Sequence, residues 1–123
     1  MKQEKIWLVT GASGGIGRAI SRELASAGYT VILQGRDLDK LTDIRKELRY
    51  NSHIVCGDLT DENARNRILN EAFDYGDIEL LVNNAGISSF SDFQDLAKRE
   101  LVNLMDINLL SPMLFTHEFL KRL

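Results

Sequence analysis

The sequence predicts an α/β fold, in which a parallel sheet carries helices on both of its faces. Short apolar runs alternate with longer stretches whose apolar residues recur at helical spacing, as expected of repeated strand and helix units. The runs are almost continuously apolar, as strands are when both faces of a sheet are covered. At 123 residues, the chain is long enough for one domain with a core and too short for a second.

The first strand is predicted at residues 5–10 and the first helix at residues 15–27. Gly28 follows, and a residue without a side chain suits the left-handed conformation that commonly ends a helix. The second strand is predicted at residues 30–34. Asp37 opens the second helix. The apolar residues of that helix share one face, and they are Leu38, Leu41, Ile44 and Leu48.

The third strand is predicted at residues 53–56 and the fourth at residues 78–82. Between them lies a third helix, which either Thr60 or Asp61 can cap through a side-chain oxygen. The apolar residues of this helix are Ala64, Ile68, Leu69, Ala72 and Phe73. After a loop at residues 87–95, a last helix is predicted.

The turn between the first strand and the first helix, residues 10–17, reads Thr-Gly-Ala-Ser-Gly-Gly-Ile-Gly. Gly11 tolerates the dihedral angles of a tight turn, Gly15 lets an anionic ligand approach the main chain, and Gly17 lets the helix pack closely on its strand. Unpaired N–H groups at the helix start, together with the helix dipole, favour a pyrophosphate near residues 13–16. The glycines alone leave an ordinary strand-to-helix loop as the alternative.

The same turn also bears on the topology of the sheet. Right-handed crossovers and a glycine-rich turn after the first strand predict the spatial strand order 3-2-1-4. The predicted architecture is therefore a Rossmann-type, doubly wound parallel sheet.

Composition and charge exclude several classes of protein. The formal net charge is −3, and the 15 basic and 18 acidic side chains are interspersed, so no basic face for nucleic acid and no polybasic membrane patch is predicted. No apolar segment approaches the roughly 20 residues of a membrane span, and the N-terminus has no signal-peptide pattern. Cys56 is the only cysteine, which excludes an internal disulfide and fits a reducing compartment, most simply the cytoplasm. No metal site is predicted.

Two motifs carry a family resemblance. The pattern Thr-Gly-x-x-x-Gly-x-Gly of residues 10–17 resembles the cofactor-binding signature of the short-chain dehydrogenase/reductase family. Asn-Asn-Ala-Gly, residues 83–86, resembles the second signature of that family and follows at a plausible distance. The resemblance runs from Ile6 to about Leu120 and covers only the first half of a usual family member. It implies that residues 1–123 form a single NAD(P)-binding Rossmann domain, incomplete at its C-terminus relative to the family.

The resemblance also implies which residues bind the cofactor. They are Gly11, Ser13, Gly15, Ile16, Gly17, Arg36, Asp58, Leu59, Asn84, Ala85 and Gly86. Asp58 and Leu59 match the pair that contacts adenine, although Asp58 is also a plausible turn residue, and the two roles are compatible. Asn83 and Asn84 are expected to tie the fourth strand to its neighbours through amide hydrogen bonds, while Ala85 and Gly86 leave room for the ribose.

The end of the second strand, Gln-Gly-Arg-Asp at residues 34–37, bears on the choice between NADP(H) and NAD(H). In Rossmann-type sites an acidic residue here binds the ribose 2′-hydroxyl, whereas an arginine accommodates a 2′-phosphate. Gly35 stands where NAD-preferring family members place the acid, and Arg36 stands where many NADP-preferring members place a base, so NADP(H) is the predicted cofactor. The alternative keeps Arg36 as a solvated residue at a helix start and Asp37 as its N-cap or a ribose ligand.

The last helix, predicted from about Leu96, is apolar on several sides and contains Asn108 and Pro112. Proline has no N–H, so the bond to the carbonyl of Asn108 four residues earlier cannot form, and a kink is expected. Asn108 also matches the helix asparagine of the family, which implies that its main chain holds a water in a proton relay. A surface asparagine beside an incidental kink is the alternative.

The catalytic serine, tyrosine and lysine of the family find no match in this sequence. None of the three tyrosines is followed by a lysine four residues later, and only His117 has that spacing to a lysine, Lys121. A helical His-Lys pair is more often a solvated face than an acid-base pair. Ser88, Ser89 and Ser91 follow residues 83–86 too closely for the catalytic serine.

Two hypotheses of function follow. In the first, the chain is the NADP(H)-binding portion of a short-chain oxidoreductase that moves hydride between the cofactor and an alcohol or carbonyl substrate. In the second, it is a non-catalytic dinucleotide-binding or protein-interaction module. An exposed edge at the fourth strand and the apolar last helix predict a homo-oligomer or another pairing at these surfaces.

Overall fold

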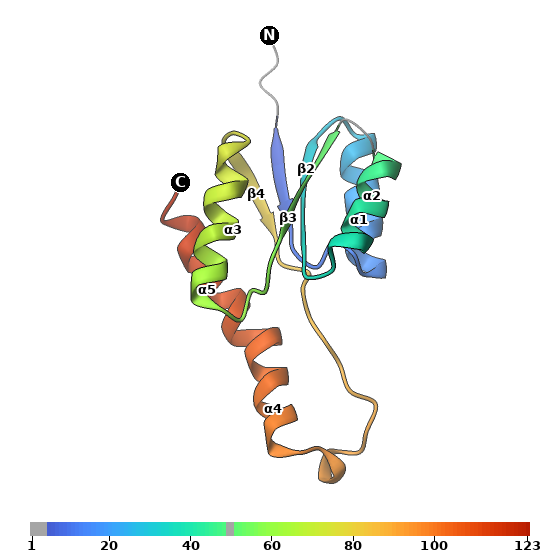
Figure 1. The fold of residues 1–123 in the computed structure, drawn as a ribbon, viewed down its shortest axis with the longest axis vertical. Coiled ribbons are helices and arrows are strands. Elements are labelled where there is room, and N and C mark those ends of the chain that lie inside the picture. Colours follow the sequence, from blue (N-terminus) through green and yellow to red (C-terminus); the bar gives the residue numbers. More distant parts are fainter. Residues whose placement is uncertain (1–4, 49–50) are drawn as a thin grey trace.

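The computed structural model describes residues 5–48 and 51–123. Its four strands form one parallel sheet in the order β3-β2-β1-β4, which confirms the predicted Rossmann-type fold and strand order (Figure 1). The strands are β1 (Ile6–Val9), β2 (Thr30–Gly35), β3 (Ser52–Cys56) and β4 (Ile78–Val82).

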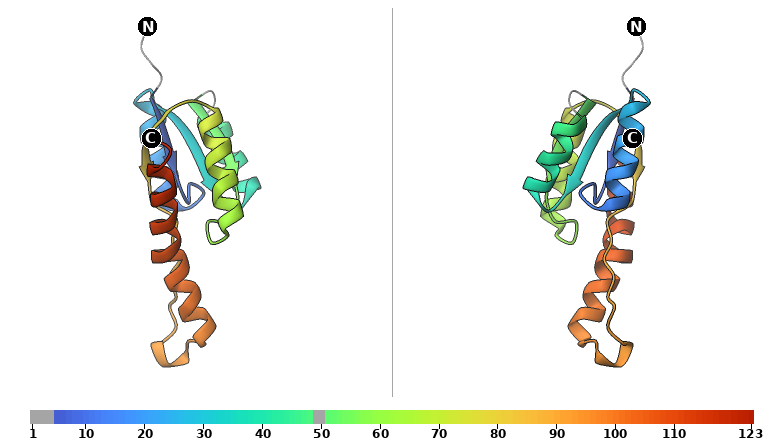
Figure 2. Two further views of the ribbon diagram at one scale, coloured as in Figure 1. Left: turned by 90° about the vertical axis from the view of Figure 1, so that its left-hand side faces the viewer. Right: turned by 90° about the vertical axis from the view of Figure 1, so that its right-hand side faces the viewer.

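Helices cover both faces of this sheet, with α1 (Gly15–Ser26) and α2 (Leu38–Leu48) on one face and α3 (Glu62–Asp74) and α5 (Ser111–Leu120) on the other (Figures 1 and 2). Each face has its own apolar core. The core under α1 and α2 contains Val9, Ala12, Val31, Leu33, Leu41 and Ile44. The core under α3 and α5 contains Ile6, Leu8, Ile32, Val55, Leu59, Ile68, Leu69, Ala72, Ile78, Phe115 and Phe119.

The starts of α2 and α3 follow from single capping residues. The Asp37 carboxylate accepts a hydrogen bond from the main-chain N–H of Lys40 at 3.2 Å, and the Asp61 carboxylate accepts one from Ala64 N–H at 2.9 Å. Of the two predicted caps for α3, Asp61 is therefore the one used. Gly28 follows α1 with a φ of 94°, the left-handed conformation predicted for it.

The last helical region differs from the single kinked helix that the sequence predicts. The helix α4 (Lys98–Met105) begins later than Leu96 and is followed by a π-helical turn, Asp106–Leu110, and then by α5. In the π turn the N–H of Ser111 bonds to the carbonyl of Asp106, five residues back. Pro112 consequently falls in the first turn of α5, a position at which proline is well tolerated.

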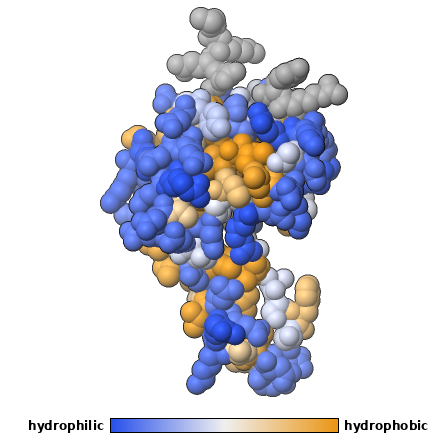
Figure 3. Space-filling model, viewed as in Figure 1, coloured by the Kyte–Doolittle hydropathy of each residue, from blue (hydrophilic) through white to orange (hydrophobic). Residues whose placement is uncertain are grey.

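The segment after β4 extends away from the sheet as an arm, which includes a 3₁₀ turn (Phe93–Asp95), α4 and the start of α5 (Figures 1 and 2). Apolar side chains lie exposed on it (Figure 3). They include Phe90, Phe93, Val102, Met105, Leu109, Leu110, Met113 and Leu114. Its helix α4 contains no buried residue.

Candidate cofactor-binding site

A cavity of about 890 Å³ opens at the carboxyl ends of the strands, where open parallel sheets bind ligands. Its lining comes from the turn after β1, the ends of β2 and β3, the segment after β4 and the start of α5. Every predicted cofactor-binding residue except Gly17 lines it: Gly11, Ser13, Gly15, Ile16, Arg36, Asp58, Leu59, Asn84, Ala85 and Gly86. Predicted cofactor-binding residues that are up to 75 positions apart in the chain thus meet in one place, as Gly11 and Gly86 do.

The three signature glycines of the turn serve three different purposes. Gly11 has a φ of +59°, and a Cβ there would lie 2.7 Å from the Cα of Ala85. A Cβ at Gly17 would lie 2.3 Å from the carbonyl oxygen of Gly11 and 2.6 Å from the amide nitrogen of Asn84. The close approach at Gly17 is thus to the turn and to Asn84, not to the strand as predicted. At Gly15 a Cβ would meet nothing within 4 Å, so the main chain there is open to a ligand.

The start of α1 is built differently from the starts of α2 and α3. Its N-cap, Gly14, makes no side-chain hydrogen bond, and no acidic residue lies in its first turn. By contrast, α3 has the Asp61 cap and Glu62, and α2 has the Asp37 cap and Asp39. The first N–H groups of α1, and the positive end of its dipole, therefore have no carboxylate to satisfy them and suit an anion.

The hydroxyl of Thr10 connects the turn after β1 to the segment after β4. It donates to the carbonyl of Val82 at 3.3 Å and accepts from the N–H groups of Asn84 at 2.9 Å and Ala85 at 3.0 Å. The side-chain amide of Asn84 donates to the carbonyl of Gly11 at 3.0 Å. Thr10 and Asn84 therefore fix both segments in the positions from which they line the cavity.

The side-chain amides of Asn83 and Asn84 tie the end of β4 to two different neighbours. The amide of Asn83 donates to the hydroxyl of Thr116 in α5 at 2.9 Å. The amide of Asn84 donates to the carbonyl of Gly11, in the turn after β1. Because successive residues of an extended segment point in opposite directions, the two amides cannot both face the same neighbour.

Gln34, at the end of β2, is a supporting residue that the sequence reasoning missed. It is buried, accepts from the N–H of Gly11 at 3.3 Å through Oε1 and donates to the carbonyl of Gly57 at 2.8 Å through Nε2. It thereby joins the turns that follow β1 and β3. The available signal was a polar residue at the end of an otherwise apolar, buried strand.

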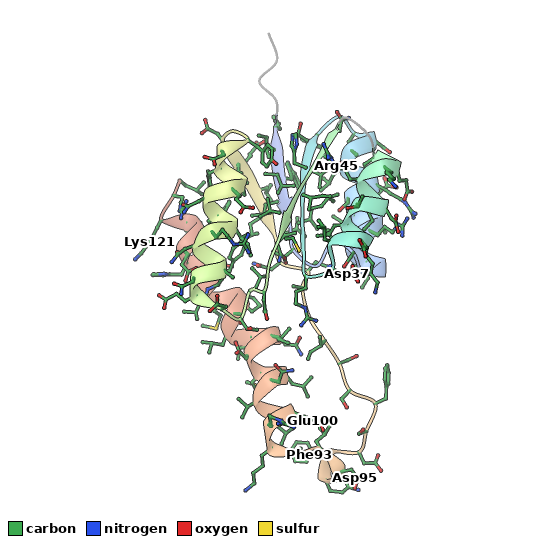
Figure 4. The ribbon with its side chains drawn as sticks, in the orientation of Figure 1. Asp37, Arg45, Phe93, Asp95, Glu100 and Lys121 are labelled. Carbon is green, nitrogen blue, oxygen red and sulfur yellow. The ribbon has the colours of Figure 1, made fainter. Side chains whose placement is uncertain are left out.

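One end of the cavity carries two cations, Arg36 and Lys40, both exposed. Asp37 lies with them at the start of α2, at the opposite end of that helix from Arg45 (Figure 4). The Asp37 carboxylate already accepts a hydrogen bond from the Lys40 main chain. A side chain at Gly35 would meet Leu41 at 3.2 Å, so the position offers little space for an acid. Sequence reasoning missed Lys40, which lies in the first turn of α2 and lines the cavity with Arg36.

Asp58 lies at the end of β3 and is engaged in a local turn. Its carboxylate accepts from the main-chain N–H of Thr60 at 3.0 Å and from the Thr60 hydroxyl at 2.8 Å. The Thr60 main-chain bond lowers the pKa of Asp58, partial burial opposes this, and the Thr60 hydroxyl and the charge of Arg36 add to the lowering. Asp58 is thus held ionised at neutral pH, as a hydrogen-bond acceptor at the rim of the cavity.

Asn108 does not line the cavity, but its neighbours Ile107 and Ser111 do. Its side chain accepts from the N–H of Ile87 at 2.8 Å and donates to the carbonyl of Ile87 at 2.7 Å. This paired contact joins the π turn to the segment after β4. Ser111 is buried and donates to the carboxylate of Asp106 at 2.6 Å.

Cys56 is a free thiol that donates to the carbonyl of Arg36 at 3.4 Å. In the described part of the chain, no three His, Cys, Asp or Glu side chains gather in a group able to hold a metal ion. None of the helices in residues 5–48 and 51–123 is long and apolar enough to span a membrane.

Known proteins resemble this chain in sequence and in structure. A family model described as short chain dehydrogenase matches residues 5–123. The 3-oxoacyl-(acyl-carrier-protein) reductase FabG of Aquifex aeolicus is 35% identical over 126 residues, which cover 98% of this chain and 51% of that protein.

Two solved structures extend the comparison. The alcohol dehydrogenase of the archaeon Thermococcus sibiricus, complexed with 5-hydroxy-NADP, is 30% identical with a TM-score of 0.90 and covers 97% of this chain and 53% of that one. A metagenomic short-chain oxidoreductase in complex with NADP is 31% identical with a TM-score of 0.88 and covers 95% and 55%. This chain spans about half the length of the curated relatives it matches. The family model, the fold and the lining of the cavity together show that the chain belongs to the short-chain dehydrogenase family.

Proposed function

We propose that this chain is the NADP(H)-binding part of a short-chain oxidoreductase that transfers hydride between nicotinamide and an alcohol or carbonyl substrate. In this proposal residues 1–123 act as a single dinucleotide-binding domain. The open, uncapped start of α1 beside Gly15 is the observation that carries it. A dinucleotide pyrophosphate supplies the negative charge that this helix start lacks, whereas α2 and α3 satisfy theirs with Asp37 and Asp61.

The remaining lining fits the two ends of such a ligand. Asp58 presents an ionised acceptor for an adenine amino group, since Thr60 occupies only one of its carboxylate oxygens. Asn84, Ala85 and Gly86 lie across the cavity, where the second ribose would lie. When bound, the cofactor supplies the hydride chemistry, and the residues of this chain hold and orient it.

The preference for NADP(H) over NAD(H) rests on Arg36. A cation here suits a 2′-phosphate, and Lys40 adds a second positive charge on the same side. Asp37 and Asp39 also line the cavity, and only Oδ1 of Asp37 is engaged as the cap of α2, which leaves its second oxygen free for the alternative ribose contact. Two solved relatives carry NADP or an NADP derivative.

We further propose that Asn108 supports a proton relay through its main-chain carbonyl. Both polar atoms of its side chain are engaged by Ile87, so the side chain holds the segment while the carbonyl precedes Pro112. The catalytic serine, tyrosine and lysine have no match in this sequence. The matched relatives are about twice as long, and we propose that these groups lie in a part of the whole protein beyond residue 123.

The absence of Tyr-x-x-x-Lys from the sequence is also what favours the second candidate, a non-catalytic dinucleotide-binding or interaction module. Tight NADPH binding without turnover of any alcohol or carbonyl by the whole protein would favour that candidate.

We also propose self-association through the exposed edge of β4 and the apolar side chains of α5. We further propose a cytoplasmic location, in keeping with the free thiol of Cys56.

Replacement of Arg36 by alanine tests the cofactor assignment. We expect Arg36→Ala to weaken NADPH binding by about 1 to 3 kcal/mol and to leave NADH binding little changed, because a charged donor to the 2′-phosphate is lost. Titration calorimetry with both cofactors measures the difference. Arg45→Ala, at the other end of α2, is the matched control (Figure 4). Equal losses for the two cofactors would contradict the assignment.

A further inference from the structure

Arg65, in α3, is a buried cation outside the predicted site. It is only 5% exposed, and its helix packs against the sheet on the side of α5. Burying a charge is costly unless the charge is paired and its donors are satisfied. The hydrogen-bond partners of Arg65 therefore indicate why the charge is buried.

The guanidinium reaches two different parts of the molecule. Its Nε donates to both carboxylate oxygens of Glu118 in α5, at 3.2 and 3.1 Å. Its Nη1 donates to the main-chain carbonyl of Leu59 at 3.0 Å. Arg65 therefore links the last helix to the loop that follows β3, and Glu118 holds the guanidinium in the orientation from which Nη1 meets that carbonyl.

The loop so held forms the adenine side of the cavity. Leu59 is 8% exposed, packs into the core under α3 and α5, and lines the cavity together with Asp58 and Thr60. The main chain of Leu59 is thus bound from behind by Arg65, while the neighbouring carboxylate of Asp58 faces the ligand space. A shift of this carbonyl would displace the Asp58 acceptor with it.

A second arginine of α3 supports the same loop from its other end. Arg67 donates from Nη2 to the carbonyl of Cys56 at 3.0 Å, and a Cβ on Gly57 would lie 2.6 Å from this nitrogen. Two arginines from one helix therefore bind main-chain carbonyls on both sides of residues 57–58. A tie between α3 and α5 alone would need the Glu118 contact and not the two contacts to the loop.

We propose that Arg65 is a positioning residue for adenine recognition, holding the Leu59 carbonyl, and through it Asp58, at the adenine end of the cavity. The proposal rests on the dinucleotide function proposed above. It assigns Glu118 a role as well, because Glu118 orients the guanidinium from α5. The last helix is thereby coupled to the loop that follows β3.

The test compares NADPH with its hypoxanthine analogue, which lacks the adenine amino group. A lysine at position 65 has a single ammonium group and cannot reproduce the fixed fork that serves Glu118 and Leu59 together. We expect Arg65→Lys to weaken NADPH binding roughly tenfold and to weaken binding of the analogue much less, so that discrimination between the two ligands falls. A merely structural role would lower the urea midpoint and weaken both ligands by the same factor.

Two further variants complete the experiment. Arg45→Lys is the matched control, because Arg45 also donates to a main-chain carbonyl, that of Ser52 at 3.2 Å, but at the opposite end of β3. It should leave the discrimination ratio unchanged. If Arg65→Lys does not fold, Glu118→Gln decides the question, with a smaller loss of discrimination expected.

The possible results separate the two proposals. A wild-type chain that does not bind NADPH would overturn the proposed function, and the role of Arg65 with it. NADPH binding by the wild type, together with an unchanged discrimination ratio in the folded Arg65 or Glu118 variant, would overturn the positioning role alone. A selective loss of discrimination in that variant, with no such loss in Arg45→Lys, would support it.

Discussion

The sheet body (residues 5–48 and 51–82) and the C-terminal arm (residues 87–123) differ in how their apolar residues are covered. In the body, β1 and β2 are almost wholly buried, under α1 and α2 on one face and under α3, together with α5 of the arm, on the other. In the arm, the buried residues are Ser111, Phe115 and Phe119, and most other large apolar side chains are exposed. One face of the sheet is thus covered by helices of the body alone, whereas the other also depends on α5 of the arm, where most other large apolar side chains are exposed.

The difference matters because both regions line the same cavity. The body contributes the glycine-rich turn, Arg36 and Asp58, and the arm contributes Ile87, Ile107 and Ser111. A few contacts join the arm to the body or to the segment after β4. They include the packing of Phe115 and Phe119 and the hydrogen bonds Asn83–Thr116 and Arg65–Glu118, while Asn108–Ile87 joins the π turn to the start of the arm. The geometry of one wall of the cavity therefore depends on a small number of side chains.

Truncation of Phe115, which packs the arm onto the body, should have the largest effect on stability. Phe115 is fully buried in the core under α3 and α5, so Phe115→Ala should lower the free energy of unfolding by about 3 to 5 kcal/mol. Urea denaturation followed by circular dichroism measures the loss. Met113→Ala, two residues away and 61% exposed, is the control and should change stability by about 0.5 kcal/mol or less.

The same pair of variants also tests whether the arm is open in solution. If Met113→Ala cost as much as Phe115→Ala, and the loss grew with protein concentration, the arm would be covered in solution by a second copy. That outcome would replace the open arm described above with an interface and would support the proposed self-association. A loss independent of concentration would leave self-association without support from this helix.

Removal of the Asn108 side chain should have a smaller, local effect. Asn108→Ala removes two hydrogen bonds to Ile87 in an exposed setting, where water can replace the partners, so we expect a loss of about 1 kcal/mol. Amide hydrogen exchange should accelerate at Ile87 more than in β1. Asn103→Ala, on the exposed surface of α4, is the control. Unchanged exchange at Ile87 would show that the arm is held by other contacts.

The smallest effect concerns Asp58, in the body, and depends on pH. Its folded pKa is lowered below the ordinary value of 3.8, chiefly by the Thr60 main-chain bond. The ionised carboxylate therefore stabilises the fold above pH 3.8, and this contribution is lost as the pH falls through the lower folded pKa. Asp58→Asn should be slightly less stable than the wild type at pH 7, and the gap should close at pH values below 3.8.

Urea midpoints measured across this pH range test the Asp58 prediction, with Asp43→Asn on the exposed face of α2 as the control. The effect is small because Asp58 is exposed and solvent screens its interactions. A gap of constant size down to pH 2 would mean that the charge of Asp58 is not the source of the difference.

Much of the body was predictable from local patterns. Short, almost continuously apolar runs predicted the four strands. The rule of right-handed crossovers predicted their order, because few topologies satisfy it. The lining of the cavity followed from residues at strand ends, which meet at one edge of a parallel sheet. Gly28 was predictable for a different reason, since its left-handed conformation is a local requirement.

What the sequence did not reveal depends on contacts between distant segments. The partner of Asn83 is Thr116, and nothing local to either residue indicates that they meet. From the sequence, Arg65 looks like a solvent-exposed helix residue. Its burial depends on the position of Glu118, which lies 53 residues later in the chain. Proline chemistry alone predicts that the helical bonding must change near position 112, but not that the change takes the form of a π turn.

The Thr10 hydroxyl also limits which residues the position can accept. A hydroxyl has one donor and two acceptor sites, and Thr10 uses one for Val82, one for Asn84 and one for Ala85. Valine has nearly the same shape but would leave two main-chain N–H groups without an acceptor, and serine alone keeps the full set at the same distance from the main chain. The number of hydrogen bonds therefore specifies this position, and only threonine or serine can make all of them.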